Sequence, residues 1–258
     1  MQKSSVEVCV RHKEYMMKRT ILKLANSFLK PFGAKIVRRG SGAFDMSSAV
    51  QRIREHDIPI KSILDIGASN GKWSIHTMDV FPSASYLAIE PLHERKDALE
   101  NLKKRYSNFD YVLCVAGDTD DQEVTLNVSD DLDGSTVDGT GGELRKVPVR
   151  TVDAIISERK LGGPFLLKFD THGYEIPILN GARDTLDRTN VIVMEVYNFE
   201  ITDLAKRFHE MCLHMEKLGF RCYDIANPML RLYDKAFWQM DIFFCRSNSR
   251  IFTYFHYR

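Results

Sequence analysis

Residues 61–74 have the sequence KSILDIGASNGKWS, in which a short apolar run leads into a turn of small residues. The spacing predicts a strand, a turn with two glycines and then a helix that carries Trp73. A second apolar run, 85–90, ends on an acidic residue, Glu90. A glycine turn followed at this distance by a carboxylate is typical of a nucleoside-binding βαβ unit, where the carboxylate accepts both hydroxyls of a ribose.

The glycines indicate which nucleoside ligand to expect. A dinucleotide-binding turn has the pattern G-x-G-x-x-G, whereas this turn contains only Gly67 and Gly71. Asp65, at the end of the strand, can hold a cationic amino group or a water. A zwitterionic cofactor without phosphates fits these residues better than NAD, and S-adenosylmethionine is the candidate. The residues predicted to contact it are Asp65, Gly67, Ala68, Ser69, Asn70, Gly71, Glu90, Pro91, Ala116 and Asp170.

The composition is that of an ordinary globular protein. The chain has 258 residues, of which 44% are hydrophobic and 28% charged, enough for one full α/β domain with extensions. No apolar run approaches the roughly 20 residues needed to span a bilayer, and the N-terminus lacks the apolar core of a secretory signal. We therefore expect a cytoplasmic protein.

The net charge of +1 is unevenly distributed. Up to Arg39 there are ten Lys and Arg against two Glu, and beyond it 26 against 33, a net of −7. We predict a basic helical leader and linker over residues 1–42 and a catalytic domain over 43–258. Within the leader, 13–30 has the apolar spacing of an amphipathic helix. This helix either rests on an anionic membrane surface near a lipid-linked substrate, or packs on the domain or in a homodimer.

The rest of the chain alternates apolar runs with helical patterns. A helix is expected before Pro59, and strands are expected near 63–66, 85–90, 111–116, 164–169, 191–196, 220–225 and 237–245. This alternation predicts a doubly wound, mostly parallel α/β sheet. Between the third and fourth strands, alternating residues at 124–128 and 147–149 predict a β-hairpin insertion. The polar segment 130–142 is expected to form a mobile loop over one edge of the site.

A second motif, LKFDTHGYE at 167–175, is a buried strand that ends in a polar tip. Asp170 and His172 lie in this tip, and Glu195 lies inside the next apolar run. The carboxyl ends of parallel strands meet at one edge of an open α/β sheet. We therefore expect these three side chains to converge beside the nucleoside-binding residues.

Five segments carry a family resemblance: 64–71 (LDIGASNG), 90–91 (EP), 167–175, 179–182 (LNGA) and 239–244 (QMDIFF). Together they resemble the FkbM family of S-adenosylmethionine-dependent methyltransferases. The first motif is shared by many class I methyltransferases, whereas the second is much more specific. The resemblance implies a seven-stranded Rossmann-like sheet with an antiparallel last strand. It also implies O-methylation, often of sugar hydroxyls in polysaccharide, glycolipid or antibiotic pathways.

The base has to be inferred from this chain, because members of the family often carry Glu or Gln where this sequence has His172. His172 is the predicted base, since imidazole exchanges protons near neutral pH. Asp170 is expected to orient His172 or the amino group of the cofactor, and Glu195 to hold a sugar hydroxyl. Alternatively, the three ligate a divalent metal that acidifies the hydroxyl, although a metal is not the favoured prediction.

Two other functions fit the same fold. An RNA methyltransferase would use the basic leader, but it would also need a broad basic surface on the catalytic domain, which carries a net of −7. A non-catalytic cofactor-binding module would result if the loop around His172 were a decayed site. The favoured partner is therefore a sugar or glycan acceptor and not a nucleic acid.

Overall fold

The computed structural model describes residues 25, 27–29, 31, 42–137 and 141–257. Contacts divide the chain into two units, Met1–Gly42 and Ala43–Arg258. The amphipathic helix predicted over 13–30 lies mostly outside the described residues. Among the helices that are described, none has the length and apolar character needed to span a bilayer.

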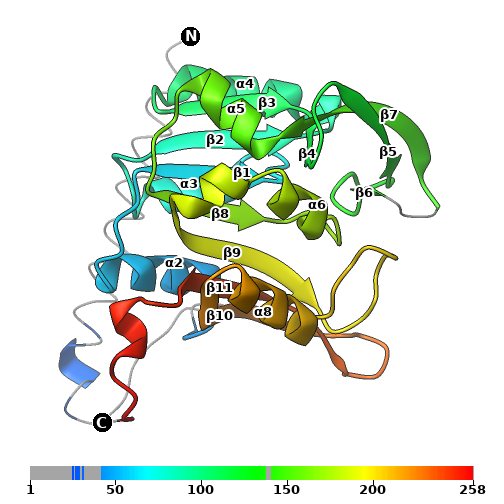
Figure 1. Ribbon diagram of the computed structural model, residues 1–258. Helices are drawn as coiled ribbons and strands as arrows, with labels where there is room; N and C mark the ends of the chain where they lie inside the picture. The colour runs from blue at the N-terminus through cyan, green and yellow to red at the C-terminus, as the bar shows by residue number, and fades with distance from the viewer. Residues whose placement is uncertain (1–24, 26, 30, 32–41, 138–140, 258) are drawn as a thin grey trace. The chain divides into compact units, whose positions relative to one another are not determined.

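A seven-stranded sheet runs through the second unit in the order β10-β11-β9-β8-β1-β2-β3 (Figure 1). Within the described sheet, β11 is antiparallel to both of its neighbours and all other pairs are parallel. The predicted sheet with an antiparallel last strand is thereby confirmed. The strands are β1 Ser62–Ile66, β2 Ser85–Glu90, β3 Phe109–Leu113, β8 Phe165–Phe169, β9 Thr189–Tyr197, β10 Phe220–Leu230 and β11 Phe237–Arg246.

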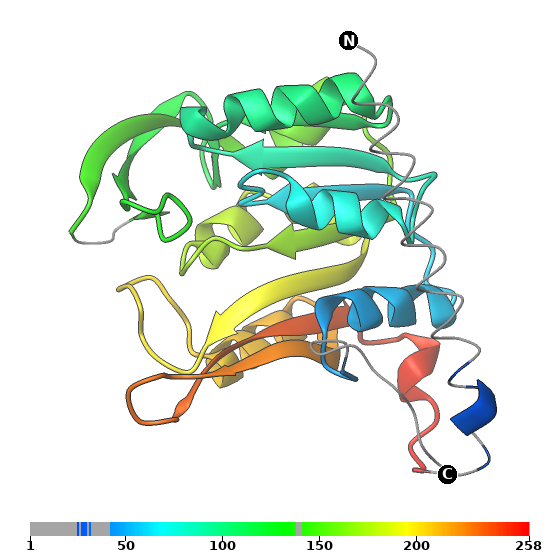
Figure 2. The ribbon, with the colours of Figure 1, turned by 180° about the vertical axis from the view of Figure 1, so that it is seen from behind.

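Helices cover both faces of this sheet (Figures 1 and 2). Successive strand residues point to opposite faces, so Leu64 packs with one helical layer and Ile63 with the other. The first layer contains α5 Val152–Arg159, α6 Glu175–Asn180, α7 Arg183–Asp187 and α8 Phe208–Lys217. The second contains α2 Met46–Glu55, α3 Lys72–Met78 and α4 Lys96–Arg105, the last preceded by the short 3-10 helix η2 His93–Arg95.

The first described helix shows how local sequence sets these boundaries. The carboxylate of Asp45 accepts a hydrogen bond from the backbone N–H of Ser48 at 3.0 Å and caps α2. Ala49 and Ile53 are fully buried on one side of α2. Thr151 caps α5 in the same way, through the N–H of Ala154 at 3.2 Å.

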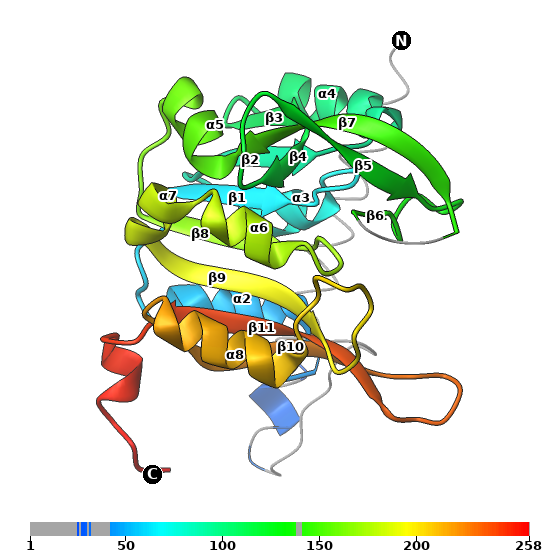
Figure 3. The ribbon, with the colours of Figure 1, turned by 45° about the vertical axis from the view of Figure 1, so that its right-hand side comes forward.

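The third predicted strand, 111–116, is wrong as a single element. The N–H of Cys114 still bonds the carbonyl of Glu90 at 3.1 Å, but the chain bends at Cys114, so the run divides into β3 and β4 Val115–Gly117. β4 then begins a separate four-stranded sheet, visible beside the first in Figure 3. Its order is β4-β7-β5-β6, with β5 Gln122–Val128, β6 Thr136–Val137 and β7 Glu143–Thr151.

The insertion is a β-hairpin extended by two short strands. β5 and β7 pair antiparallel, with Val124 opposite Val147, as the alternating sequence predicted. β4 pairs in parallel with the end of β7, so that Gly117 lies opposite Thr151. The segment between Gly117 and Thr151 therefore begins and ends at one place in the smaller sheet.

Gly67 allows the turn after β1 to contact the tip after β8. Its φ is +74°, in the left-handed region, and a Cβ at this position would overlap the backbone carbonyl of Asp170. The N–H of Gly67 donates to the carbonyl of Ile89 at 3.0 Å, and the N–H of Asp170 donates to the carbonyl of Ile66 at 3.0 Å. The close approach of the two loops thus requires a residue without a side chain.

We expect Gly67→Ala to lower the free energy of unfolding by about 3 kcal/mol, because left-handed strain and steric overlap add together. Gly219→Ala is the matched control. Gly219 has a φ of +82°, but no atom lies within 4 Å of the point that a Cβ would occupy there. Gly219→Ala should therefore lower the free energy of unfolding by only about 1 kcal/mol, from backbone strain alone. Urea denaturation followed by circular dichroism measures both values, and equal losses would show that the overlap carries no cost.

Candidate active site

A cavity of about 430 Å³ lies at the carboxyl edge of the seven-stranded sheet. Its wall combines the glycine turn, the end of β2, the insertion and the tip after β8. His172 and Glu195 line it, so the cavity brings together both predicted groups of site residues. The predicted cofactor residues that line it are Gly67, Ala68, Ser69, Asn70, Glu90, Pro91, Ala116 and Asp170.

Two residues predicted to contact the cofactor do not line this cavity. Asp65 is 0% exposed, and its carboxylate accepts a hydrogen bond from Ser74 Oγ at 2.8 Å beneath the site. Gly71 caps the start of α3 with a φ of 73° and lies against Leu102 of α4. Neither residue lines the cavity, and the contact of each with the cofactor stays a prediction.

Lys168 connects the floor of the site to its edge. It lies opposite Asp65 in the register of β1 and β8, and its Nζ is 3.2 Å from the Oδ1 of that residue. The same Nζ donates to Asp170 Oδ2 at 2.9 Å and to the Gly67 carbonyl at 3.2 Å. Burial lowers the pKa of Lys168, but the two carboxylates outweigh it and hold that pKa above its ordinary value. Lys168 is therefore a charged member of a buried ion cluster.

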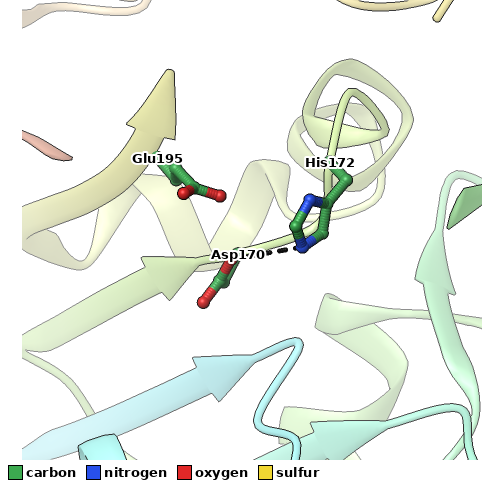
Figure 4. A group of neighbouring side chains, drawn as sticks. All are labelled: Asp170, His172 and Glu195. Carbon is green, nitrogen blue, oxygen red and sulfur yellow. Dashed lines mark ion pairs between the residues drawn. The ribbon is translucent and has the colours of Figure 1, made fainter. Parts of the chain in front are cut away.

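Asp170, His172 and Glu195 form a compact group at one end of the cavity (Figure 4). One nitrogen or oxygen atom from each lies within 4.8 Å of the others. His172 Nε2 is 3.6 Å from Asp170 Oδ1. His172 has a φ of 50°, so the tip turns sharply here and directs the imidazole back toward the ends of β8 and β9.

The two carboxyl groups of this cluster have different proton affinities. Burial raises the pKa of Glu195 to about 8, and the nearby carboxylate of Asp170 contributes to that rise. Burial would also raise the pKa of Asp170, but the nearby Lys168 and His172 outweigh burial and keep that pKa below its usual range. At neutral pH Asp170 is therefore ionised while Glu195 mostly retains its proton.

Sequence reasoning missed two residues that hold this cluster in place. The hydroxyl of Tyr197 donates to Glu195 Oε2 at 2.8 Å and lies 3.1 Å from His172 Nδ1. This hydroxyl therefore links the imidazole of His172 to the carboxyl group of Glu195. The amide of Gln239 donates to Glu195 Oε1. Tyr197 could have been found, since it lies two residues after Glu195 and shares its strand face.

The insertion closes one side of the cavity. Its turn places the carboxylate of Asp133 over the glycine turn, where Oδ1 accepts from Ser69 Oγ at 2.8 Å and from Arg95 Nη2 at 2.6 Å. Leu126 and Leu132 add apolar lining. The loop thus borders the site as predicted, and its mobility stays a prediction.

The cavity offers the donors and acceptors that an adenosyl amino acid needs. Burial raises the pKa of Glu90. Hydrogen bonds to its carboxylate from the N–H of Leu92 at 2.9 Å and of Ser69 at 2.7 Å partly oppose that rise. Trp73 Nε1 and Arg95 Nε are buried in its lining without a hydrogen-bond partner among the described residues. Unpaired buried donors of this kind fit a ligand that carries acceptor atoms.

The parallel strands, the glycine turn and the cavity at their carboxyl edge define an S-adenosylmethionine-dependent methyltransferase domain. A family model described as "Methyltransferase FkbM domain" matches residues 65–222, and the chain therefore belongs to the FkbM methyltransferase family. The resemblance seen in the sequence is confirmed, and so is S-adenosylmethionine as the cofactor.

Comparison with curated proteins gave no match. Among solved structures, the chain is similar to precorrin-6y C5,15-methyltransferase from Geobacter metallireducens GS-15, with 13% identity over 77% of this chain and 86% of that chain and a TM-score of 0.43. It is also similar to 1,6-didemethyltoxoflavin-N1-methyltransferase from Burkholderia thailandensis, with 10% identity over 92% and 90% of the two chains and a TM-score of 0.44. Likeness at this level says nothing about the substrate of this chain.

We expect Lys168→Met to lower the free energy of unfolding by about 3 kcal/mol or more, because it leaves a buried carboxylate without a counter-charge. The double variant Asp65→Asn/Lys168→Met should recover about 1 kcal/mol or more of that loss. Arg150→Ala breaks an exposed pair with Glu158 and should change stability by less than about 1 kcal/mol. Urea denaturation measures all three, and a Lys168→Met loss no larger than that of Arg150→Ala would contradict the role given to the cluster.

Proposed function

We propose that this chain transfers a methyl group from S-adenosylmethionine to a hydroxyl of a sugar in a glycan, a glycolipid or a glycosylated metabolite. The supporting observation is the position of His172, which lines the end of the cavity with its Nε2 3.6 Å from Asp170 Oδ1 and its Nδ1 3.1 Å from the Tyr197 hydroxyl. A hydroxyl is a weak nucleophile until its proton is removed, and a neutral imidazole can accept that proton.

Each cavity residue has a part in this proposal. S-adenosylmethionine, when bound, would supply an activated methyl group and leave as S-adenosylhomocysteine as its S–C bond breaks. The carboxylate of Glu90 would accept hydrogen bonds from the ribose hydroxyls, and Ser69 and Asn70 in the glycine turn would line the cofactor site. His172 Nε2 takes the proton of the acceptor hydroxyl as the new C–O bond forms, and ionised Asp170 stabilises the resulting imidazolium. Glu195, largely protonated, hydrogen-bonds a neighbouring hydroxyl and helps to align the acceptor.

The charge of the domain favours a sugar acceptor over RNA. Beyond Arg39 the chain has 26 basic residues against 33 acidic ones. A nucleic acid would need a basic surface to neutralise its phosphates, whereas an uncharged sugar has no such requirement.

A metal-assisted form of the reaction is the second candidate. The grouping of Asp170, His172 and Glu195 within 4.8 Å favours it, because a carboxylate oxygen from each acid and an imidazole nitrogen are suitable ligands for a divalent ion. The ion would then acidify the hydroxyl in place of the histidine base. The ammonium of Lys168 weighs against a bound metal, because it already balances the negative charge of the Asp170 carboxylate.

Calorimetric titration of S-adenosylhomocysteine into wild type and Glu90→Ala tests the cofactor site. We expect micromolar binding that weakens by about 10- to 100-fold in the variant, the usual effect of removing a charged hydrogen-bond acceptor. Glu94→Ala is the control. Glu94 lies nearby in η2, but its carboxylate pairs with Arg145 at 2.8 Å and does not line the cavity. No binding to the wild type would remove the basis of the proposal.

Turnover with sugar acceptors separates the two mechanisms. After dialysis against EDTA we expect full activity, with no gain on adding magnesium, and a fall in kcat of about 10²- to 10⁴-fold in His172→Ala at unchanged S-adenosylhomocysteine affinity. Loss of activity in EDTA that magnesium restores would favour the metal instead. Cofactor binding without turnover on any sugar would favour a non-catalytic module.

A further inference from the structure

The tip between β8 and α6 holds His172 in an uncommon backbone conformation. His172 has a φ of 50° and Gly173, the next residue, has a φ of 100°, so two successive residues are left-handed. A residue with a Cβ adopts this conformation only at a cost in free energy. Contacts made by the rest of the tip must therefore hold His172 in place.

The side chain of Glu175 makes such contacts. Its Oε1 accepts a hydrogen bond from the N–H of Gly173 at 2.9 Å and another from the hydroxyl of Thr171 at 3.0 Å. Thr171 and Gly173 are the two neighbours of His172 in the chain. One oxygen atom thus binds the tip on both sides of the histidine.

The carboxyl group of Glu175 is itself firmly placed. Glu175 is the first residue of α6 and is only 4% exposed. Ile178 and Leu179 of the same helix lie in the core. A buried carboxyl group is costly unless it is hydrogen-bonded, so the two donors of the tip are needed where they stand. Glu175 therefore ties the tip to a helix that cannot shift without disturbing the core.

Glu175 can influence the site only through its neighbours. Thr171 and His172 line the cavity, whereas Glu175 does not. The imidazole of His172 is held at its other end by the Tyr197 hydroxyl, 3.1 Å from Nδ1. The position of the ring therefore depends on two contacts, one to its side chain and one, through Glu175, to the backbone around it.

We propose that Glu175 is a positioning residue for methyl transfer, which holds the backbone around His172 so that the imidazole faces the acceptor hydroxyl. The inference rests on the proposed function, in which His172 takes the proton of that hydroxyl. A base must lie within hydrogen-bond reach of the proton, and a displacement of about 1 Å can slow a reaction by about 100-fold. Without Glu175, the tip is free to leave the left-handed conformation and the imidazole moves out of reach.

The test compares Glu175→Ala with Glu175→Gln in the full-length protein, with turnover measured on a sugar acceptor. Glutamine keeps an oxygen that can accept both hydrogen bonds, so Glu175→Gln should retain kcat to within about threefold. Glu175→Ala should lower kcat by about 10- to 100-fold, with the KM for S-adenosylmethionine unchanged. Added to His172→Ala, Glu175→Ala should cause no further fall, because Glu175 acts only through the histidine.

Asp153→Ala is the matched control for a purely structural role. Asp153 of α5 accepts hydrogen bonds from the N–H and the hydroxyl of Thr185 in α7, so it makes the same kinds of bond outside the tip. This variant should be less stable in urea but keep the kcat of the wild type. Thr171→Val removes only the hydroxyl donor and should lower kcat by about fivefold, which provides the test if Glu175→Ala does not fold.

Three kinetic results would overturn the inference. They are a wild-type kcat in Glu175→Ala, a fall in Glu175→Gln as large as that in Glu175→Ala, and a further fall when Glu175→Ala is added to His172→Ala. The second would assign the effect to the charge of Glu175 and not to its hydrogen bonds.

Crystal structures of wild type and Glu175→Ala with S-adenosylhomocysteine give a readout that needs no acceptor. The imidazole of His172 should be displaced by about 1 Å or more in the variant. An imidazole that stays in place would overturn the inference whether or not an acceptor has been found. Failure of the wild type to methylate any sugar would instead remove the proposed function, and the two structures would still decide whether Glu175 places His172.

Discussion

The buried ammonium of Lys168 is the interaction on which the geometry of this site depends. It lies where β1 and β8 run side by side, and it contacts the carboxylate of Asp65, the carbonyl of Gly67 and the carboxylate of Asp170. These contacts link the turn that borders the cavity to the tip that carries Asp170 and His172. Buried charges are costly unless they are fully paired, so the cluster tolerates few alternative arrangements of the two loops.

The surroundings of Asp170 and Glu195 account for the different pKa shifts of their carboxyl groups. Asp170 touches the ammonium and is held ionised, whereas Glu195 has burial and a neighbouring carboxylate around it and is held largely protonated. Tyr197 then contacts both Glu195 and His172 and holds the two side chains together. The buried cation thus keeps Asp170 ionised, while burial and the Asp170 carboxylate raise the pKa of Glu195.

Much of this architecture could be predicted from the sequence, because strand patterns, Gly67 and Glu90 are local signals with a direct physical meaning. Local patterns do not reveal that the side chain of Asp65 is directed away from the cavity. Asp65 shares a strand face with Ile63, and this face packs beneath α3, so its carboxylate meets Ser74 and not the cavity. The division of the third strand at Cys114 was missed as well, since an unbroken apolar run does not show which sheet each half joins.

The paired ends of the insertion have an evolutionary consequence. Gly117 and Thr151 lie opposite each other in the smaller sheet, so the segment between them begins and finishes at one place. A segment closed on itself in this way can be lengthened, shortened or replaced without shifting the pairing of the seven strands. This wall of the cavity, and hence what the cavity admits, can therefore change while the larger sheet keeps its register.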